Sequence, residues 1–311
     1  MVEGSRVQRV LAQNPSPMTL EGTNTYLLAG EGQAIVIDPG PAFEGHLEAI
    51  VQRAKSAKLR IAAIAVTHGH PDHAPGAAPL RERTGAPVYA HREALFPHDA
   101  ALAEGERLAV EGLELEVLEA PGHARDHLVF AFQREATLFT GDVVVGRGTV
   151  VVAPPGGDMR AYQATLERLR RDFAEFTCLL GGHGDPVDRP AEKLDAYIAH
   201  RQLREREILH ALGDGARTIP AMVGRIYREV PAALWPVAAR QVLAHLTALA
   251  GEGRVSARRL ERRLTPFERE ILAPDLSRIA DPQSAAVARA ELGMTESIAT
   301  IDEYEPIGAI A

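Results

Sequence analysis

Thr67-His-Gly-His-Pro-Asp-His73 follows directly after the apolar run Ile61-Ala-Ala-Ile-Ala-Val66. The run is typical of a buried strand, so the polar residues are expected at a strand end. Polar groups desolvated there without partners would cost several kcal/mol. Divalent ions such as Zn2+, in contrast, prefer this mixture of nitrogen and oxygen ligands. The pattern therefore predicts a metal site, and the alternative is a solvated, inert turn. The candidate ligands in it are His68, His70, Asp72 and His73.

The same arrangement of an apolar strand and a small turn recurs three times downstream. Residues 113–118 lead into Pro121-Gly-His123, residues 136–139 lead into Thr140-Gly-Asp142, and residues 176–180 lead into Gly181-Gly-His183. If these strands lie side by side, their ends gather the polar residues at one edge of a sheet. The candidates are enough for two metal ions with positions left for water and substrate: His68, His70, Asp72, His73, His123, Asp142 and His183.

This ordered set of motifs resembles the metallo-β-lactamase-fold hydrolases over about the first 190 residues. The resemblance implies an α/β protein, with an αβ/βα sandwich of two mixed sheets that helices cover on their outer faces. It also implies two Zn2+ ions, with Mn2+ or Fe2+ as alternatives. One ion would be held by His68, His70 and His123. The second would be held by Asp72, His73 and His183, and Asp142 would bridge the pair.

Such a site predicts hydrolysis. Two ions about 3.5–4 Å apart can share a water, lower its pKa towards neutrality and present it as a hydroxide nucleophile. Asp72 is the candidate catalytic residue, because a carboxylate beside that water can exchange protons. The alternative is that Asp72 is a ligand with no proton-transfer role.

Two further residues have open interpretations. His127 lies four residues after His123 and could support the site or position substrate, or it could simply begin a strand. Asp38 follows the apolar run 34–37 and could orient a metal-binding histidine by accepting its second ring N–H. It could equally form only an Asp-Pro-Gly turn.

The predicted bridging carboxylate bears on the type of hydrolase. Zinc β-lactamases commonly have a cysteine, or no bridging ligand, where this chain has Asp142. An aspartate there is similar to the thioesterase, phosphodiesterase and ribonuclease branches. The only cysteine, Cys178, lies in a hydrophobic strand and is expected to pack in the core. Antibiotic hydrolysis is therefore expected only as a weak side activity.

Composition sets the broad class. The 311 residues are 46% hydrophobic and 24% charged, which suffices for one full-sized core and a smaller module. A single cysteine excludes intramolecular disulfides and suits a reducing compartment. The sequence shows neither a secretory leader after Met1 nor the roughly 20 apolar residues needed to cross a bilayer. A cytoplasmic protein without a membrane partner is expected.

Charge is unevenly distributed. The net charge of −8 alone argues against a nucleic-acid partner, but residues 200–263 contain 12 basic and 6 acidic residues. Helices are expected over 191–212, 219–230 and 235–250, followed by a basic turn at 254–259. This order predicts a winged-helix-like module over 191–263, after a catalytic domain over 1–190. The alternative is a basic helical surface with only a packing role.

Together with the segment from Asn14 to Tyr26 and the element from Pro121 to His127, this module resembles the lactamase-beta-2-like proteins over roughly residues 7–262. The resemblance implies an endoribonuclease or phosphodiesterase that acts on single-stranded RNA. The basic module would hold the RNA through salt-sensitive phosphate contacts. Trp235, between apolar neighbours, is expected to pack in the core rather than stack on a base.

Two other functions remain open. One is a glyoxalase II-like thioesterase, esterase or lactonase with a small ester or thioester substrate. The other is a nucleic-acid-binding protein whose metal site is only structural.

Residues 264–311 carry 9 acidic and 3 basic side chains. They are expected to form an acidic extension that is loosely packed or covers a partner. The sequence does not predict the oligomeric state.

Overall fold

The computed structural model describes residues 6–272 and 299–307, which belong to two compact units. The first unit comprises Met1–Val150 and Arg160–Ile198, and the second comprises Val151–Met159 and Ala199–Ala311. No helix within the described ranges is both long and apolar enough to cross a membrane.

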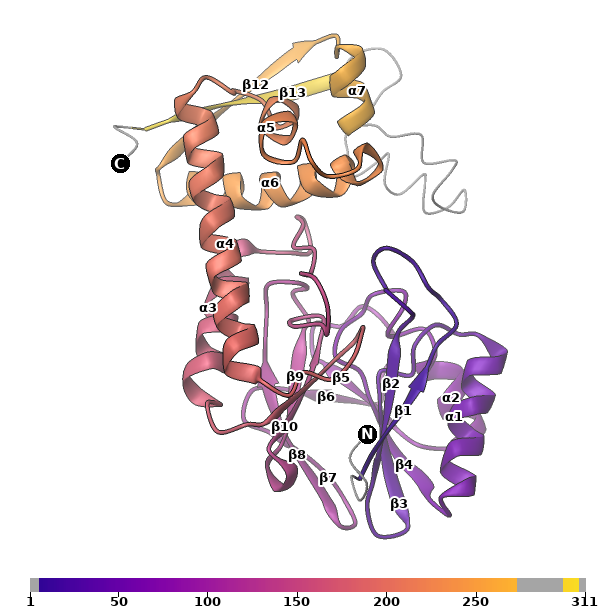
Figure 1. Ribbon diagram of the computed structural model, residues 1–311. Coiled ribbons are helices and arrows are strands. Elements are labelled where there is room, and N and C mark those ends of the chain that lie inside the picture. Colours follow the sequence, from indigo (N-terminus) through magenta and orange to yellow (C-terminus); the bar gives the residue numbers. More distant parts are fainter. Residues whose placement is uncertain (1–5, 273–298, 308–311) are drawn as a thin grey trace. The chain divides into compact units, whose positions relative to one another are not determined.

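A six-stranded mixed sheet forms one half of the first unit (Figure 1). Its strands lie in the order in which they occur along the chain. The first and second strands pair antiparallel, as do the second and third, and the third to sixth strands are mutually parallel. They are β1 (Val7–Leu11), β2 (Asn24–Ala29), β3 (Gln33–Ile37), β4 (Arg60–Ala65), β5 (Val88–His91) and β6 (Ala100–Leu102).

A five-stranded sheet forms the other half, in the order β11-β10-β9-β8-β7. Only β10 and β11 are parallel, because the chain crosses between them through α3 (Met159–Asp172). The strands are β7 (Arg107–Val110), β8 (Leu113–Glu119), β9 (Leu128–Phe132), β10 (Thr137–Gly141) and β11 (Cys178–Gly181), with a 3-10 turn at Gln133–Glu135. The strands expected at 113–118, 136–139 and 176–180 are present, with ends that differ by one or two residues.

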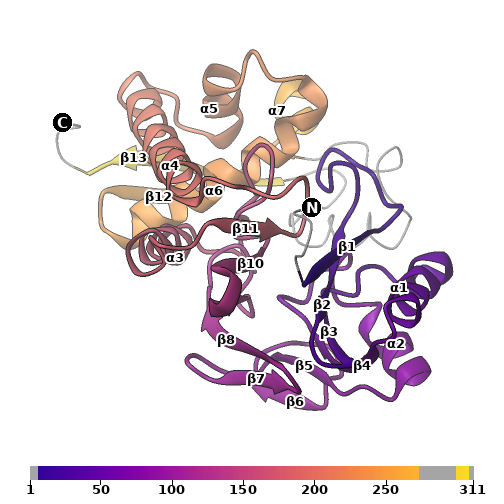
Figure 2. The ribbon, with the colours of Figure 1, turned by 60° about the horizontal axis from the view of Figure 1, so that its bottom comes forward.

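The alternation of side chains along β2 defines the layers. Leu28 packs between the two sheets in a core that includes Phe130 and Phe139. Leu27 points the other way, into a second core with Leu47 of α1 (Glu44–Ser56) and residues of α2 (Ala77–Thr84). Figure 2 shows α1 and α2 outside one sheet and α3 outside the other. The expected αβ/βα sandwich is confirmed, and Cys178 packs against the inter-sheet core as predicted.

The second unit contains the expected helices around its own core. Its elements are the later part of α4 (Pro190–Gly213), α5 (Ile219–Ile226), a 3-10 turn at Ala232–Leu234, α6 (Trp235–Gly251), α7 (Pro266–Leu272), β12 (Val255–Arg262) and β13 (Ala299–Pro306). The apolar positions predicted on the third helix, Val242, Leu246 and Leu249, are buried. Trp235 packs against this core, edge to face with Phe267 at 5.7 Å, as expected.

Two local predictions in this unit are wrong. The helix expected over 219–230 ends at Ile226. The indole N–H of Trp235 is shared between the carbonyls of Tyr227 and Val230, at 3.2 and 3.1 Å, in the irregular segment beyond the helix. The basic turn expected at 254–259 is instead largely strand β12, because β13 pairs with it along its whole length.

The described parts of the acidic extension are packed, which corrects the expectation of a loose tail. Strand β13 is antiparallel to β12, and its Ile301 and Tyr304 are buried. Ile271 of α7 is buried in the same core as Tyr304. A count of acidic residues does not register the apolar residues between them, and the burial of these apolar side chains stabilises the segment. The rest of the predicted extension, 273–298 and 308–311, lies outside the described residues.

Candidate metal centre

The seven predicted ligands lie together, because each follows a strand that ends at the same edge of the sandwich. The loop after β4 carries four of them, and the ends of β8, β10 and β11 each lead to one more. Their donor atoms form three overlapping groups, each within 4.8 Å. These groups are His68, His70 and His123; His68, His73 and Asp142; and Asp72, His73 and His183.

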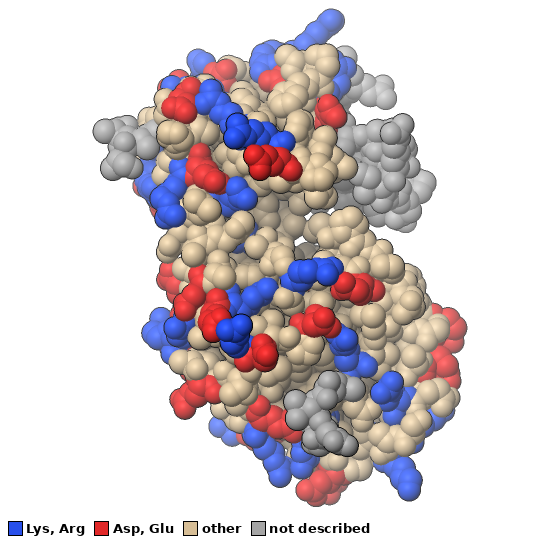
Figure 3. All heavy atoms as spheres, in the orientation of Figure 1, with Lys and Arg blue, Asp and Glu red and all other residues tan. Residues whose placement is uncertain are grey.

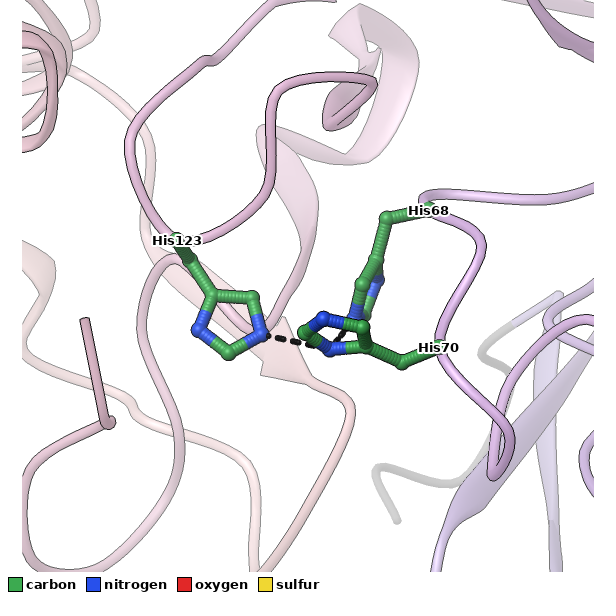
Figure 4. A group of neighbouring side chains, drawn as sticks. All are labelled: His68, His70 and His123. Atoms are coloured by element: carbon green, nitrogen blue, oxygen red, sulfur yellow. Dashed lines mark hydrogen bonds between the residues drawn. The ribbon is translucent and has the colours of Figure 1, made fainter. Parts of the chain in front are cut away.

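Three imidazole rings converge in the first of these groups, His68, His70 and His123, which is called the first triad below (Figure 4). The Nε2 atoms of His68 and His123 lie 2.9 and 3.0 Å from Nδ1 of His70. A neutral imidazole has one nitrogen with a free lone pair, so nitrogens that face one another can direct lone pairs at a common point. This arrangement suits a cation.

The third of these groups, Asp72, His73 and His183, is called the second triad below, and its two imidazole rings face a carboxylate oxygen of Asp72. Oδ2 of Asp72 lies 3.2 Å from Nε2 of His183 and 3.4 Å from Nε2 of His73. The His73 ring is fully buried, whereas the Asp72 side chain is 26% exposed. Asp72 is therefore the member of this triad that solvent can reach.

Asp142 lies between the two triads. Its Oδ2 is 3.3 Å from Nε2 of His183 and 3.7 Å from Nε2 of His123, which belong to different triads. Its Oδ1 is 3.5 Å from Nε2 of His73. One carboxylate thus reaches both groups of histidines.

Unsatisfied polar atoms show that this cluster fits metal ions. Nε2 of His73 and Oδ1 of Asp142 are buried, and neither has a hydrogen-bond partner among the described residues. Such atoms are rare in folded proteins and call for an explanation such as a bound ion. Imidazole nitrogens with carboxylate oxygens suit Zn2+, and also Mn2+ or Fe2+.

The electrostatics of the metal-free cluster are those of a cation site. Burial, followed by the neighbouring histidines, holds the pKa of His68 well below its ordinary value, which keeps the ring neutral and able to bind metal. Burial also opposes charge on His183, but Asp142 and Asp72 outweigh it and raise its pKa to about 9. The same carboxylates, with Asp38, raise the pKa of the buried His73. A metal ion would displace these protons.

Asp38 orients His73, which was one of its two predicted roles. Its Oδ2 accepts hydrogen bonds from Nδ1 of His73 and Oγ1 of Thr67, both at 2.8 Å. Its Oδ1 accepts from the backbone N–H of Thr67 at 2.7 Å. Because Nδ1 is held by this carboxylate, Nε2 of His73 faces the ligand cluster.

His127 contacts two of the candidate ligands but does not belong to any of the candidate ligand groups. Its Nε2 accepts a hydrogen bond from the backbone N–H of Asp142 at 3.1 Å, and its ring stacks on that of His68. The residue is only 1% exposed, so it does not line a surface that substrate could touch. The geometry favours support of the site over substrate positioning.

The sequence did not assign a role to the segment from Asn14 to Tyr26, which also contacts the cluster. Thr23 donates through Oγ1 to Oδ2 of Asp72 at 3.4 Å, and two hydrogen bonds of 2.9 Å link it to the Asn14 side chain. The Gly22 carbonyl accepts from Nδ1 of His183 at 3.3 Å. These contacts join residues 49 and 161 positions apart, so no local spacing could have predicted them.

Two family models match the chain. The first describes the metallo-beta-lactamase superfamily and matches residues 18–183. The second describes a beta-lactamase associated winged helix domain and matches residues 218–262. The first range contains all seven predicted ligands, and the second contains α5, α6 and β12.

The relatives cover both units. The chain is 36% identical to a "Beta-lactamase-like protein 2 homolog" of Drosophila melanogaster, over 81% of this chain and 90% of the relative. It is 33% identical to an "Atrochrysone carboxyl ACP thioesterase" of Aspergillus fumigatus, over 73% and 75%. A metallo-beta-lactamase family protein of Thermus thermophilus has a similar fold, with a TM-score of 0.69, 24% identity, and coverage of 81% of this chain and 96% of that one.

Proposed function

The chain belongs to the metallo-beta-lactamase superfamily, and from this premise we propose that it is a hydrolase that uses two divalent metal ions to cleave acyl thioesters or related esters. Zn2+ is the proposed ion, with Mn2+ or Fe2+ as alternatives. The observation that carries the two-ion proposal is the position of Asp142, whose Oδ2 lies within 3.7 Å of histidines from both triads.

The seven candidate ligands would have distinct roles in hydrolysis. When bound, the ions would supply an activated water and a Lewis acid for the oxygen under attack. His68, His70 and His123 would hold one position and Asp72, His73 and His183 the other, with Asp142 shared. Asp72 would also exchange a proton at its carboxylate, because its side chain is 26% exposed against 12% for Asp142.

Charge pairing in the second unit favours a small acyl substrate over RNA. Strand β12 carries the arginines that would contact phosphates, but Arg258 pairs with Glu303 at 3.0 Å and Arg259 pairs with Asp302 at 3.1 Å. Arg262 pairs with Glu268 of α7. Acidic partners at these distances oppose the phosphate contacts through which RNA would bind.

The overall charge of this part of the chain supports the same view. Residues 264–311 contain six more acidic than basic residues, which cancels the excess of six basic residues over 200–263. Figure 3 shows basic and acidic side chains interspersed on the visible face. The name of the Aspergillus relative adds support for a thioester substrate.

A substrate panel tests this proposal. The purified full-length protein, with its metal content measured on the same sample, is incubated with acyl thioesters, aryl esters and end-labelled single-stranded RNA. We expect thioester or ester hydrolysis that is lost on chelation and in Asp142→Ala. It should be retained in Asp172→Ala, which removes an exposed carboxylate of α3. Cleavage of RNA alone, with the same dependence on metal and Asp142, would replace the acyl substrate with a phosphodiester.

A further inference from the structure

His127 is a buried histidine that the proposed ligand set does not use. It is absent from all three candidate ligand groups among the described residues. Its Nε2 accepts the hydrogen bond from the backbone N–H of Asp142 at 3.1 Å. Its Nδ1 is buried without a hydrogen-bond partner among the described side chains and backbone. A buried polar atom without a partner is rare in a folded protein and calls for an explanation.

The turn that carries Asp142 packs closely against the His127 ring. Gly141 adopts φ = +46°, and a Cβ there would lie 2.6 Å from Oγ1 of Thr67 and 2.9 Å from His127 ring atoms. The N–H of Val143 closes the turn by donating to the Thr140 carbonyl at 2.9 Å. The N–H of Asp142 takes no part in this closure and finds its acceptor in His127.

The same ring also contacts the first triad. The rings of His127 and His68 stack with centroids 4.7 Å apart and planes inclined by 19°. One face of the His127 ring therefore packs on His68, a candidate ligand. Its Nε2 atom holds the backbone N–H of Asp142, whose carboxylate is shared by both triads. No other described histidine outside the ligand groups has both contacts.

We propose that His127 is a positioning residue that sets the Asp142 carboxylate between the two ion positions. It does so by accepting the Asp142 N–H at Nε2, which requires the tautomer with its proton on Nδ1. This inference rests on the two-ion site of the proposed function. It adds to that site a residue outside the candidate ligand groups, which acts through Asp142.

Three substitutions separate the hydrogen bond from simple filling of space. Glutamine places its side-chain oxygen close to where Nε2 lies, so His127→Gln keeps an acceptor for Asp142. Asparagine is one carbon shorter and places its oxygen near the Nδ1 position, so His127→Asn does not reach. Leucine fills space without an acceptor. His245→Leu is the matched control, because His245 is also 1% exposed but lies on α6 of the second unit.

The readout is magnetic rather than catalytic. The full-length protein is loaded with Mn2+, the bound metal is counted, and exchange coupling between the ions is measured by electron paramagnetic resonance. We expect two coupled ions in the parent, in His127→Gln and in His245→Leu. We expect His127→Leu and His127→Asn to lose the coupling or the second ion, because the shared carboxylate is no longer held between the positions.

A folded His127→Leu protein with the parent's metal count and coupling would overturn the inference. If His127→Leu does not fold, the pair of amide variants decides, and equal coupling in His127→Asn and His127→Gln overturns it as well. A parent protein that binds no coupled pair would instead refute the two-ion site itself. The two failures are therefore distinguishable.

Discussion

Asp38→Asn should weaken metal binding without removing any ligand. The carboxylate accepts three hydrogen bonds of 2.7–2.8 Å from His73 and Thr67. An amide has one oxygen, so its NH2 group must face at least one of these donors. Each bond to a charged acceptor contributes about 1.5–3 kcal/mol, so a loss of that size is expected in the free energy of unfolding. Loss of an orienting partner typically weakens metal affinity about 10–100-fold.

Competition with a chelator of known affinity measures the metal dissociation constant, and urea denaturation measures stability. Asp99→Asn is the control. Asp99 also accepts from a side chain and a backbone N–H, those of Arg81 and Val88, but it is exposed and belongs to none of the candidate ligand groups. Its substitution should leave metal affinity unchanged. A dissociation constant for Asp38→Asn within about twofold of the parent would refute the orienting role, because it corresponds to under about 0.5 kcal/mol.

Three further predictions concern protons and charge pairs. The neighbouring carboxylates raise the pKa of His183 to about 9, so metal binding at pH 7 should release a proton from this residue. The affinity for metal should therefore rise with pH up to about 9. Calorimetry in buffers of different ionisation enthalpy would measure the proton release, and binding heats that do not depend on the buffer would contradict it. Glu268 accepts from Arg262 and Thr265, which lowers its pKa from 4.5 to about 2. Its stabilisation should therefore be present above pH 4.5 and fade towards pH 2, and Glu268→Gln should cost about 1–3 kcal/mol at pH 7 in urea denaturation, with equal stability counting against the pairing. Asp302→Asn combined with Glu303→Gln should increase RNA binding at low salt, and binding equal to the parent's would show that these pairs do not suppress it.

The strands before the site and the candidate ligands were predictable because their signals are local. A strand followed by a short polar turn is visible within ten residues, and four such units predicted seven side chains that the structure brings together. The strand before the first four ligands lies in the six-stranded sheet and the strands before the other three lie in the five-stranded sheet, so the packing of the two sheets that brings the ligands together was not visible in the spacing. The αβ/βα arrangement itself came from the resemblance carried by these motifs.

The remaining features depend on contacts between distant segments. Thr23 reaches Asp72 across 49 residues, and β13 pairs with β12 in a register that no charge count indicates. The acidic content of the C-terminal segment indicated an extension that is loosely packed or covers a partner. In the structure, Asp302 and Glu303 pair with the arginines opposite, while Ile301 and Tyr304 are buried.

Anomalous diffraction from a crystal grown with excess zinc tests the central claim most directly. Two zinc peaks are expected about 3.5–4 Å apart, with the Asp142 carboxylate between them and the two triads on either side. A single peak, or zinc bound away from these seven side chains, would contradict the two-ion hydrolase.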